Sequence, residues 1–325
     1  MKYDVYGIGS PLMDMMVTAE EQILIELKLD KGGMFLVDED KLGNTLDLVK
    51  ESIVKTTSGD STANAIVGLA NLGGKGAYLG KVGKDNHGET FISDLTSKGV
   101  DSKIVKSNHM TGTVIALITP DSERTMIVCL GACKELSPED IIEQDIIDSK
   151  ILHITGYQLE EPKLKETAIK AMEIAKKNNV KISLDLADFN LIKRNKEFLR
   201  SIVKDYANIV FANAEEAHAF TGKEPRDALE EISTMTDVAI VKVGKNGSMI
   251  KAQGKVYDIP CYNVEAVDTT GAGDMYAAGV LYGMCMNMNY EKAGKIGAFG
   301  ASKVVEQIGA RLDISLKEKI AEIIK

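Results

Sequence analysis

The sequence contains little proline or cysteine, and it has no long hydrophobic run. Only 6 prolines are spread over 325 residues, and no repeat or low-complexity tract occurs, so no linker is expected to divide the chain. The longest apolar stretch, Met275 to Met286, has 12 residues, which is too short to span a bilayer. The 4 cysteines have no neighbouring ligands that would complete a zinc site, so we expect reduced thiols.

An excess of basic residues is also missing. Lys and Arg total 39 against 48 Asp and Glu, for a net charge of −9, which disfavours a nucleic-acid partner. The opening run MKYDVYGIGS is typical of a β-strand rather than of a signal peptide. We therefore expect a cytoplasmic globular protein with no membrane partner.

Short β-rich runs alternate with longer amphipathic segments. In the segment 163–177, apolar residues recur on one face of a helix. This alternation predicts an α/β fold with a doubly wound, mostly parallel sheet flanked by helices. Strands are expected at 4–8, 77–81, 114–119, 125–129, 151–155, 181–185, 209–212, 238–243 and 248–251, and helices at 61–72, 87–98, 138–145, 162–178, 214–220, 225–234, 272–286, 290–308 and 315–324.

One region departs from this alternation. Residues 103–129 contain strand-like runs around a polar turn at Pro120, with no helix long enough for a crossover. Together with part of 12–37, they are expected to form a small β-sheet lid over a cleft. The whole chain, 1–325, is then one α/β domain carrying that lid.

Three phosphate-binding signatures are nearly matched but incomplete. The run that begins at Gly7 has Leu12 where a dinucleotide fingerprint needs its third glycine, which disfavours a dehydrogenase. The run from Gly73 to Gly76 lacks the upstream glycine and the trailing Ser/Thr of a Walker A loop. Asp188 begins a DFN triplet, but the chain has no HRD catalytic loop of a protein kinase.

The most informative run is Gly271-Ala272-Gly273-Asp274, which directly precedes an apolar helix. Small residues let a ligand approach the backbone, and the free N–H groups at the helix start point toward one spot. The positive end of the helix dipole reinforces them, so the run suits a phosphoryl group in transfer. Asp274 would accept the proton of an attacking hydroxyl. The alternative is an ordinary helix with an acidic first turn.

At these residues the sequence resembles a family. DTTGAGD at 268–274 is similar to the C-terminal signature of the PfkB, or ribokinase-like, carbohydrate and nucleoside kinases. SGDSTAN at 58–64, NAEE at 213–216 and VKVGKNGS at 241–248 resemble three further elements in the family's order. GSPLMD at 9–14, TPDSERTM at 119–126 and HITGYQL at 153–159 resemble the adenosine kinase branch. The resemblance implies a ribokinase-like fold over nearly the whole chain.

The resemblance implies a role for each matching residue. Asp274 would be the general base and Gly271–Gly273 the anion hole, while Asp14, Gly59 and Asn64 would bind the acceptor. Asp14 has the alternative of a solvated turn, and Asn64 that of a helix-surface amide. The nucleotide side would comprise Asn213, Glu216, which would organise Mg²⁺ through water, and Lys242, Gly244 and Gly247 of the glycine turn. Glu216 is preferred to its neighbour Glu215 because it fits the NxxE pattern.

Other positions are less clearly assigned. Asp268 and Thr270 resemble positions near a monovalent cation such as K⁺, although Asp268 could simply tie down its turn. Asp60 stands where the family usually has glycine, so its carboxylate would either bind an acceptor hydroxyl or repel an anionic acceptor. Tyr157 is a candidate for stacking on a nucleobase, but a core or rim position is the alternative. Arg124 is either a phosphate-neutralising residue of the lid or a solvated strand end.

The expected function is ATP-dependent transfer of the γ-phosphoryl group to the 5′-hydroxyl of adenosine or a related nucleoside. The same fold equally serves the alternative of a sugar kinase of the fructokinase or ribokinase type. A non-catalytic nucleotide or sugar sensor is a further alternative, supported only by Asp60. The implied cofactors are ATP and Mg²⁺, with K⁺ as a further ion, and both a monomer and a homodimer remain open.

Overall fold

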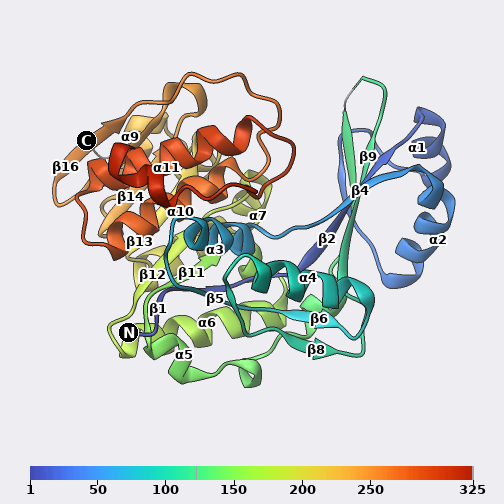
Figure 1. Cartoon of the computed structure of the whole chain (residues 1–325), viewed down its shortest axis with the longest axis horizontal. Helices are drawn as coiled ribbons and strands as arrows, with labels where there is room; N and C mark the ends of the chain where they lie inside the picture. The colour runs from blue at the N-terminus through green and yellow to red at the C-terminus, as the bar shows by residue number, and fades with distance from the viewer. Residues whose placement is uncertain (122, 324–325) are drawn as a thin grey trace.

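A large sheet forms the centre of the α/β body. The computed structural model describes residues 1–121 and 123–323 (Figure 1). Nine strands lie in the order β16-β15-β14-β13-β12-β11-β1-β5-β7. The strands from β14 to β7 run parallel, and β15 and β16 continue the sheet in antiparallel pairing. The strands are β1 (Tyr3–Ile8), β5 (Gly76–Leu79), β7 (Asp101–Ser102), β11 (Ser149–Thr155), β12 (Lys181–Asp185), β13 (Ile209–Asn213), β14 (Val238–Lys242), β15 (Ser248–Ala252) and β16 (Lys255–Ile259).

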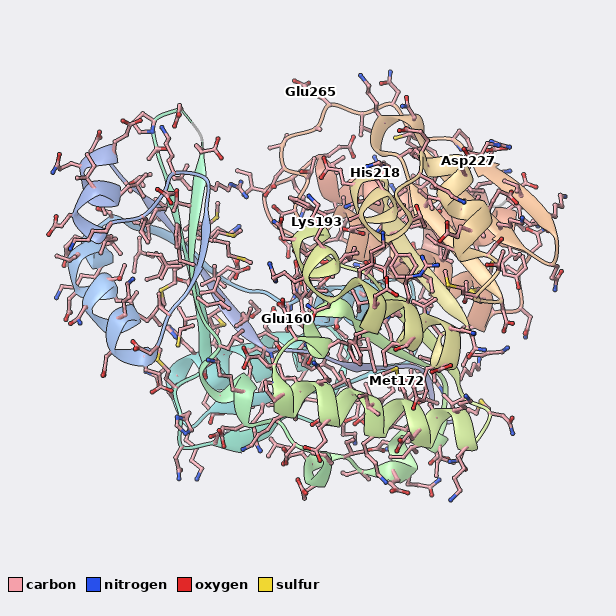
Figure 2. The ribbon with its side chains drawn as sticks, turned by 180° about the vertical axis from the view of Figure 1, so that it is seen from behind. Glu160, Met172, Lys193, His218, Asp227 and Glu265 are labelled. Carbon is pink, nitrogen blue, oxygen red and sulfur yellow. The ribbon has the colours of Figure 1, made fainter. Side chains whose placement is uncertain are left out.

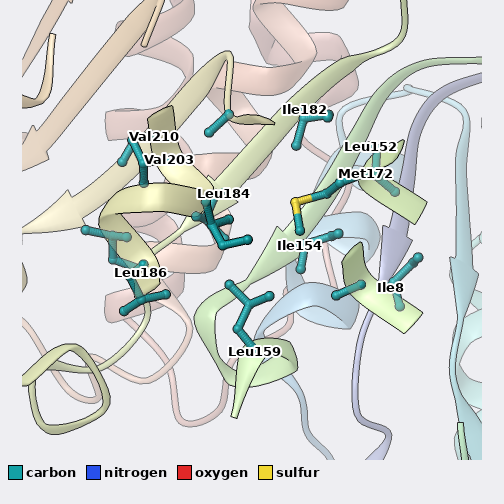
Figure 3. Close-up of a cluster of buried hydrophobic side chains, with 14 of the residues drawn as sticks. Ile8, Leu152, Ile154, Leu159, Met172, Ile182, Leu184, Leu186, Val203 and Val210 are labelled. Atoms are coloured by element: carbon teal, nitrogen blue, oxygen red, sulfur yellow. The ribbon is translucent and has the colours of Figure 1, made fainter. Parts of the chain in front are cut away.

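Helices cover both faces of this sheet, as the sequence predicts. One face packs against α5 (Glu143–Ile147), α6 (Pro162–Lys177), α7 (Phe189–Tyr206), α8 (Ala214–Thr221) and α9 (Pro225–Ile232). Figure 3 shows part of this core, in which Met172 lies close to Leu152 and Ile154. The other face packs against α3 (Ser61–Asn71), α4 (Asn86–Ser97), α10 (Ala272–Cys285) and α11 (Tyr290–Val305).

A second, smaller sheet stands beside the α/β body. Its five strands lie in the order β3-β10-β9-β2-β4, and α1 and α2 cover its outer face, at the right of Figure 1. The predicted segments 12–37 and 103–129 contribute four of these strands, but β4 was not predicted. These elements are β2 (Leu12–Thr18), α1 (Glu21–Leu27), β3 (Met34–Leu36), α2 (Glu39–Val49), β4 (Ile53–Ser58), β9 (Gly112–Ile118) and β10 (Arg124–Cys129). A separate pair joins β6 (Lys81–Gly83) to β8 (Val105–Ser107).

One helix of the α/β body was not predicted, and two predicted helices were wrong. Helix α7 was not predicted because the polar run around Asn195, whose φ of −123° and ψ of 19° are non-helical, interrupts its apolar spacing. The segment 138–145 forms a short 3-10 turn, Pro138–Asp140, before α5 rather than one helix. The helix expected at 315–324 is a 3-10 turn, Lys317–Lys319, followed by α12 (Ile320–Ile323), and Ile324 lies outside the described residues. Across residues 1–121 and 123–323, none of the helices has the length and apolar character needed to cross a membrane.

Candidate active site

The candidate site lies at the carboxyl ends of the parallel strands. Asp185 ends β12, Asn213 ends β13 and Lys242 ends β14. Ser10 follows β1, and Tyr157 lies in the turn that follows β11. The carboxyl edge of a parallel sheet is where open α/β folds bind ligands, because the connecting loops and helix N-termini converge there. The fold therefore gathers at one edge residues that are far apart in the sequence.

Asp274 lies in the first turn of α10, and its carboxylate faces the start of α3. Ser61 Oγ donates a hydrogen bond to Asp274 Oδ1, and Asn64 Nδ2 donates to Asp274 Oδ2 over 2.9 Å. Burial raises the pKa of Asp274, while the hydrogen bonds from Ser61 and Asn64 lower it. A partly desolvated carboxylate held by two donors has the fixed orientation that a general base needs.

The backbone before Asp274 forms a tight helix start. Gly271 has φ +77°, and a Cβ added there would lie 2.4 Å from the Cβ of Ala310, so only glycine fits. The N–H of Ala272 donates to the carbonyl of Thr269 over 3.2 Å, so this amide of the predicted anion hole, Gly271–Gly273, is not free. Within the described part of the chain, the amides of Gly273 and Asp274 have no recorded partner. The first turn of α10 therefore offers two free donors, the amides of Gly273 and Asp274, and within the described residues the amide of Gly271 before it also has no partner.

A largely buried lysine faces this helix start. Lys242 Nζ lies 3.2 Å from the position that a Cβ on Gly273 would take. It also donates to Asp185 Oδ2 over 3.1 Å. Burial alone would lower the pKa of Lys242, but the Asp185 and Glu216 carboxylates raise it above its ordinary value. A permanent positive charge therefore sits beside the two free amides, where a phosphoryl group would be stabilised.

Asn213 and Glu216 form a reciprocal cap at the start of α8. Glu216 accepts hydrogen bonds from the backbone N–H and the Nδ2 of Asn213, and Asn213 Oδ1 accepts from the Glu216 N–H. Burial, and secondarily Asp185, raise the pKa of Glu216 to about 7. No group of three or more potential metal ligands occurs in the described residues, so a cage made of protein side chains is not offered there. If Mg²⁺ enters with the nucleotide phosphates and its own water ligands, Glu216 is the carboxylate that would organise it through water.

A cleft of about 860 Å³ separates the small sheet from the strand ends. Figure 2 shows Glu160, one of its lining residues, on the side of the α/β body that faces the small sheet. The candidate residues from the sequence that line the cleft are Asp14, Asp60, Arg124, Tyr157, Asp268 and Thr270. Asp274 is not among the lining residues, and it reaches the cleft through Ser61. Another cavity of about 550 Å³ lies at the opposite, amino-terminal edge of the sheet, away from these groups.

Asp14 contributes a carboxylate to the lining of the cleft. It lies on β2, not in the turn after β1, and the described residues give its carboxylate no hydrogen-bond donor. A Cβ at Gly59 would lie 2.5 Å from Asp14 Oδ2, so glycine is what allows the two segments to approach. An unpartnered, partly buried carboxylate can accept two hydrogen bonds from a polyol.

We expect Asp14→Asn to stabilise the protein above neutral pH. Burial raises the pKa of Asp14 to about 6, and Arg311 only partly offsets this. The folded protein therefore holds a proton that the unfolded chain releases, and wild-type stability falls as pH rises between about 4 and about 6. Asparagine cannot ionise, so urea unfolding should show a gain of about 2 kcal/mol at about pH 8 and none near pH 3. Asp313→Asn, at an exposed position, is the control, and a gain independent of pH would contradict the argument.

Asp60 is part of the framework of the site. Its φ of +92° belongs to a conformation that favours glycine, so the residue is strained. Its carboxylate accepts hydrogen bonds from the backbone of Ser10 (3.2 Å), the backbone of Ala63 (2.8 Å) and the hydroxyl of Tyr78 (2.8 Å). Burial raises its pKa to about 6. Both oxygens are thus committed to the protein, which leaves little capacity for the acceptor contact that we expected.

The remaining predicted residues lie at the edges of the site. Tyr157 is 40% exposed and presents its ring to the cleft. Asp268 accepts from the N–H and hydroxyl of Thr270 and from the N–H of Gly309, and Arg124 Nη2 lies 3.9 Å from it. These bonds support the alternative that Asp268 ties down its turn. A K⁺ site at Asp268 and Thr270 stays a prediction. Gly244 and Gly247 flank the turn between β14 and β15, outside the lining of the cleft.

Sequence reasoning missed three residues of this network. Ser61 lies within the 58–64 motif, but the motif assigned it no role. Asp185 ends a predicted strand, and that position was the available signal for it. Arg311 follows α11 in an irregular segment, and no pattern in the sequence pointed to it. It is nevertheless among the most buried arginines of the cleft, with a side chain only 9% exposed.

Comparison with known proteins identifies related kinases. Residues 34–317 match the model of the pfkB family carbohydrate kinases. A probable sugar kinase from Rhizobium etli and an adenosine kinase from Sinorhizobium meliloti are each 32% identical, with TM-scores of 0.90 and 0.89, and the alignments cover 99% of both chains. A 5-dehydro-2-deoxygluconokinase from Clostridium perfringens is 29% identical over 82% of this chain and 83% of its own length.

Proposed function

The chain belongs to the PfkB family of carbohydrate kinases, and we propose that it transfers the γ-phosphoryl group of ATP to a primary hydroxyl of a sugar. Members of the family are phosphotransferases with an alcohol acceptor, so the reaction class follows from membership. The sugar as acceptor is favoured over adenosine, which we expected from the sequence, because curated relatives from several bacteria are named 5-dehydro-2-deoxygluconokinase.

The observation that carries the proposal is that the same site contains Asp274 and Asp14, whose carboxylate has no hydrogen-bond donor among the described residues. Asp14 would accept hydrogen bonds from sugar hydroxyls, and Asp274 would take the proton of the attacking primary hydroxyl. The amides of Gly273 and Asp274, together with Lys242, would stabilise charge on the transferred group. Mg²⁺ bound to the ATP phosphates would neutralise further charge. The chain's own contribution is positioning and electrostatics, which phosphoryl transfer mainly needs.

Adenosine remains the second candidate, for two reasons. The relative from Sinorhizobium meliloti is named an adenosine kinase and aligns over the whole chain. The wall that the small sheet contributes to the cleft is also apolar, with a lining that suits a nucleobase better than a free sugar. The apolar lining residues of that wall are Leu12, Met16, Met34, Leu36, Val114, Ala116, Met126 and Val128.

We further propose that the small sheet acts as a lid. Its cleft-facing wall and Arg124 stand opposite the loop that carries Thr270, to whose hydroxyl Arg124 Nη1 donates over 3.4 Å. Closure would exclude water from the phosphoryl group and limit hydrolysis of ATP. A cytoplasmic location, K⁺ and the oligomeric state stay predictions.

The test is ADP release with Mg-ATP across fructose, ribose, a keto sugar acid, adenosine and inosine. We expect kcat/KM for a sugar to exceed that for adenosine by at least about tenfold, a difference of about 1.4 kcal/mol in transition-state binding. Turnover of adenosine alone would establish the second candidate. ATP binding by calorimetry without turnover of any acceptor would support the sensor and contradict the proposed kinase.

A further inference from the structure

Arg311 lies at the junction of three segments of the site. Its Nε donates to Asn64 Oδ1 over 2.9 Å, and its Nη2 donates to the carbonyl of Gly59 over 3.4 Å. Its Nη1 forms an ion pair with Asp94 of α4, and its guanidinium lies 5.6 Å from the ring centre of Phe91. The guanidinium is thus fixed by a carboxylate and an aromatic ring on one side, and it directs its remaining donors toward α3 and its preceding turn.

The bond from Arg311 decides which way the Asn64 amide points. An amide has an accepting oxygen and a donating nitrogen, and a 180° flip exchanges them. Arg311 can only donate, so Asn64 must present Oδ1 to it and Nδ2 to Asp274. In the flipped state, the Asn64 oxygen would face the Asp274 carboxylate and an N–H would face the guanidinium, and both contacts are repulsive. A directed chain of donors therefore runs from Arg311 through Asn64 to Asp274.

The segment that carries Arg311 also contacts the loop that precedes α10, residues 268–271. Ala310 packs against Gly271 at the start of α10, and the N–H of Gly309 donates to Asp268 Oδ2 over 3.1 Å. Gln307 Nε2 donates to the carbonyl of Arg311 over 2.8 Å and closes the turn. Residues 307–311 thus link the start of α10 to α3, whose Asn64 donates to Asp274.

We propose that Arg311 is a positioning residue, which holds Asn64 in the orientation that orders Asp274 for proton transfer. The inference rests on the proposed kinase activity, and it assigns Arg311 no contact with the acceptor or with ATP. Because the oxygen and the nitrogen of the Asn64 amide are engaged by Arg311 and Asp274, loss of Arg311 should reduce the chemical step more than the binding of either substrate. Misplacement of a reacting group by about 1 Å can reduce the rate by about 10²-fold.

Arg311→Lys is the decisive variant, because lysine can keep the ion pair with Asp94 but has no fork to reach Asn64 and Gly59. We expect kcat to fall about 10- to 100-fold, with KM for ATP and for the acceptor within about threefold of wild type. Arg200→Lys is the matched control, because Arg200 likewise pairs with a carboxylate (Glu231), donates to a backbone carbonyl (Phe220) and lies over the Phe220 ring. This control should keep the wild-type kcat. A rise in acceptor KM at unchanged kcat would overturn the proposal.

A second measurement separates this inference from the proposed function. If no acceptor is turned over, thermal unfolding is measured for Arg311→Lys, Asp274→Asn and their combination. Because the two side chains interact through Asn64, the change in unfolding midpoint of the double variant should differ from the sum of the two single changes. The same cycle in an Asn64→Ala background should then be additive. Additive effects in the presence of Asn64 would overturn the inference, whatever the reaction is.

Discussion

Asp274→Asn is expected to lower kcat by about 10³-fold while leaving KM for ATP and for the acceptor within about threefold. The carboxylate is the group in position to take the hydroxyl proton, and an amide cannot accept it. Asparagine has the same shape and can still accept from Asn64 Nδ2 and hydrogen-bond to Ser61, so the fold should persist. Steady-state ADP release with the preferred acceptor measures the effect, and circular dichroism checks the fold.

The matched control for this variant is Asp145→Asn. Asp145 is also a buried carboxylate in the first turn of a helix, α5, but it lies near Lys2 and Lys103, outside the residues that line the cleft. Its substitution should leave kcat at the wild-type value. Undiminished turnover in Asp274→Asn would exclude Asp274 as the base, and a loss confined to KM would make it a binding residue instead.

The sequence predicts the α/β body well because its elements repeat a local pattern. Strand–helix alternation and the small-residue helix start at Gly271 depend on residues close together in the chain, so β12 was predicted with its observed bounds, Lys181–Asp185. The small residues at Gly271–Gly273 likewise predicted that Asp274 lies in the first turn of a helix. Strand β4 was missed because its residues, IVKTTS, are mostly polar and pair at the edge of a small sheet. Only the tertiary partner β2 makes that segment a strand.

Contacts between distant segments could not be predicted in this way. Asp60 looked like a candidate acceptor ligand because the sequence shows its charge but not its partners. The structure gives those partners as two backbone amides and the Tyr78 hydroxyl. Arg311 lies 247 residues from Asn64 in the chain, and no spacing relates the two. Long-range polar networks of this kind follow from packing, which local propensity does not determine.

The second large effect is expected for Lys242→Met. Lys242 is the cation nearest the free amides at the start of α10, so its removal should lower kcat by about 10²- to 10³-fold and weaken ATP binding as well. The substitution also leaves Asp185 as a buried carboxylate without its partner, which typically costs about 3 kcal/mol of stability. A loss of activity in the single variant therefore has two possible causes, and urea unfolding together with ADP release must be measured on the same preparations.

The combination Lys242→Met with Asp185→Asn separates these causes. Neutralising Asp185 removes the unpaired charge, so the double variant should regain most of the stability lost in Lys242→Met. Its kcat should stay low, because the positive charge beside Gly273 is still absent. If activity returned together with stability, Lys242 would serve only to balance Asp185. Charge stabilisation of the phosphoryl group would then depend on the two amides of α10 and on the ions that ATP carries.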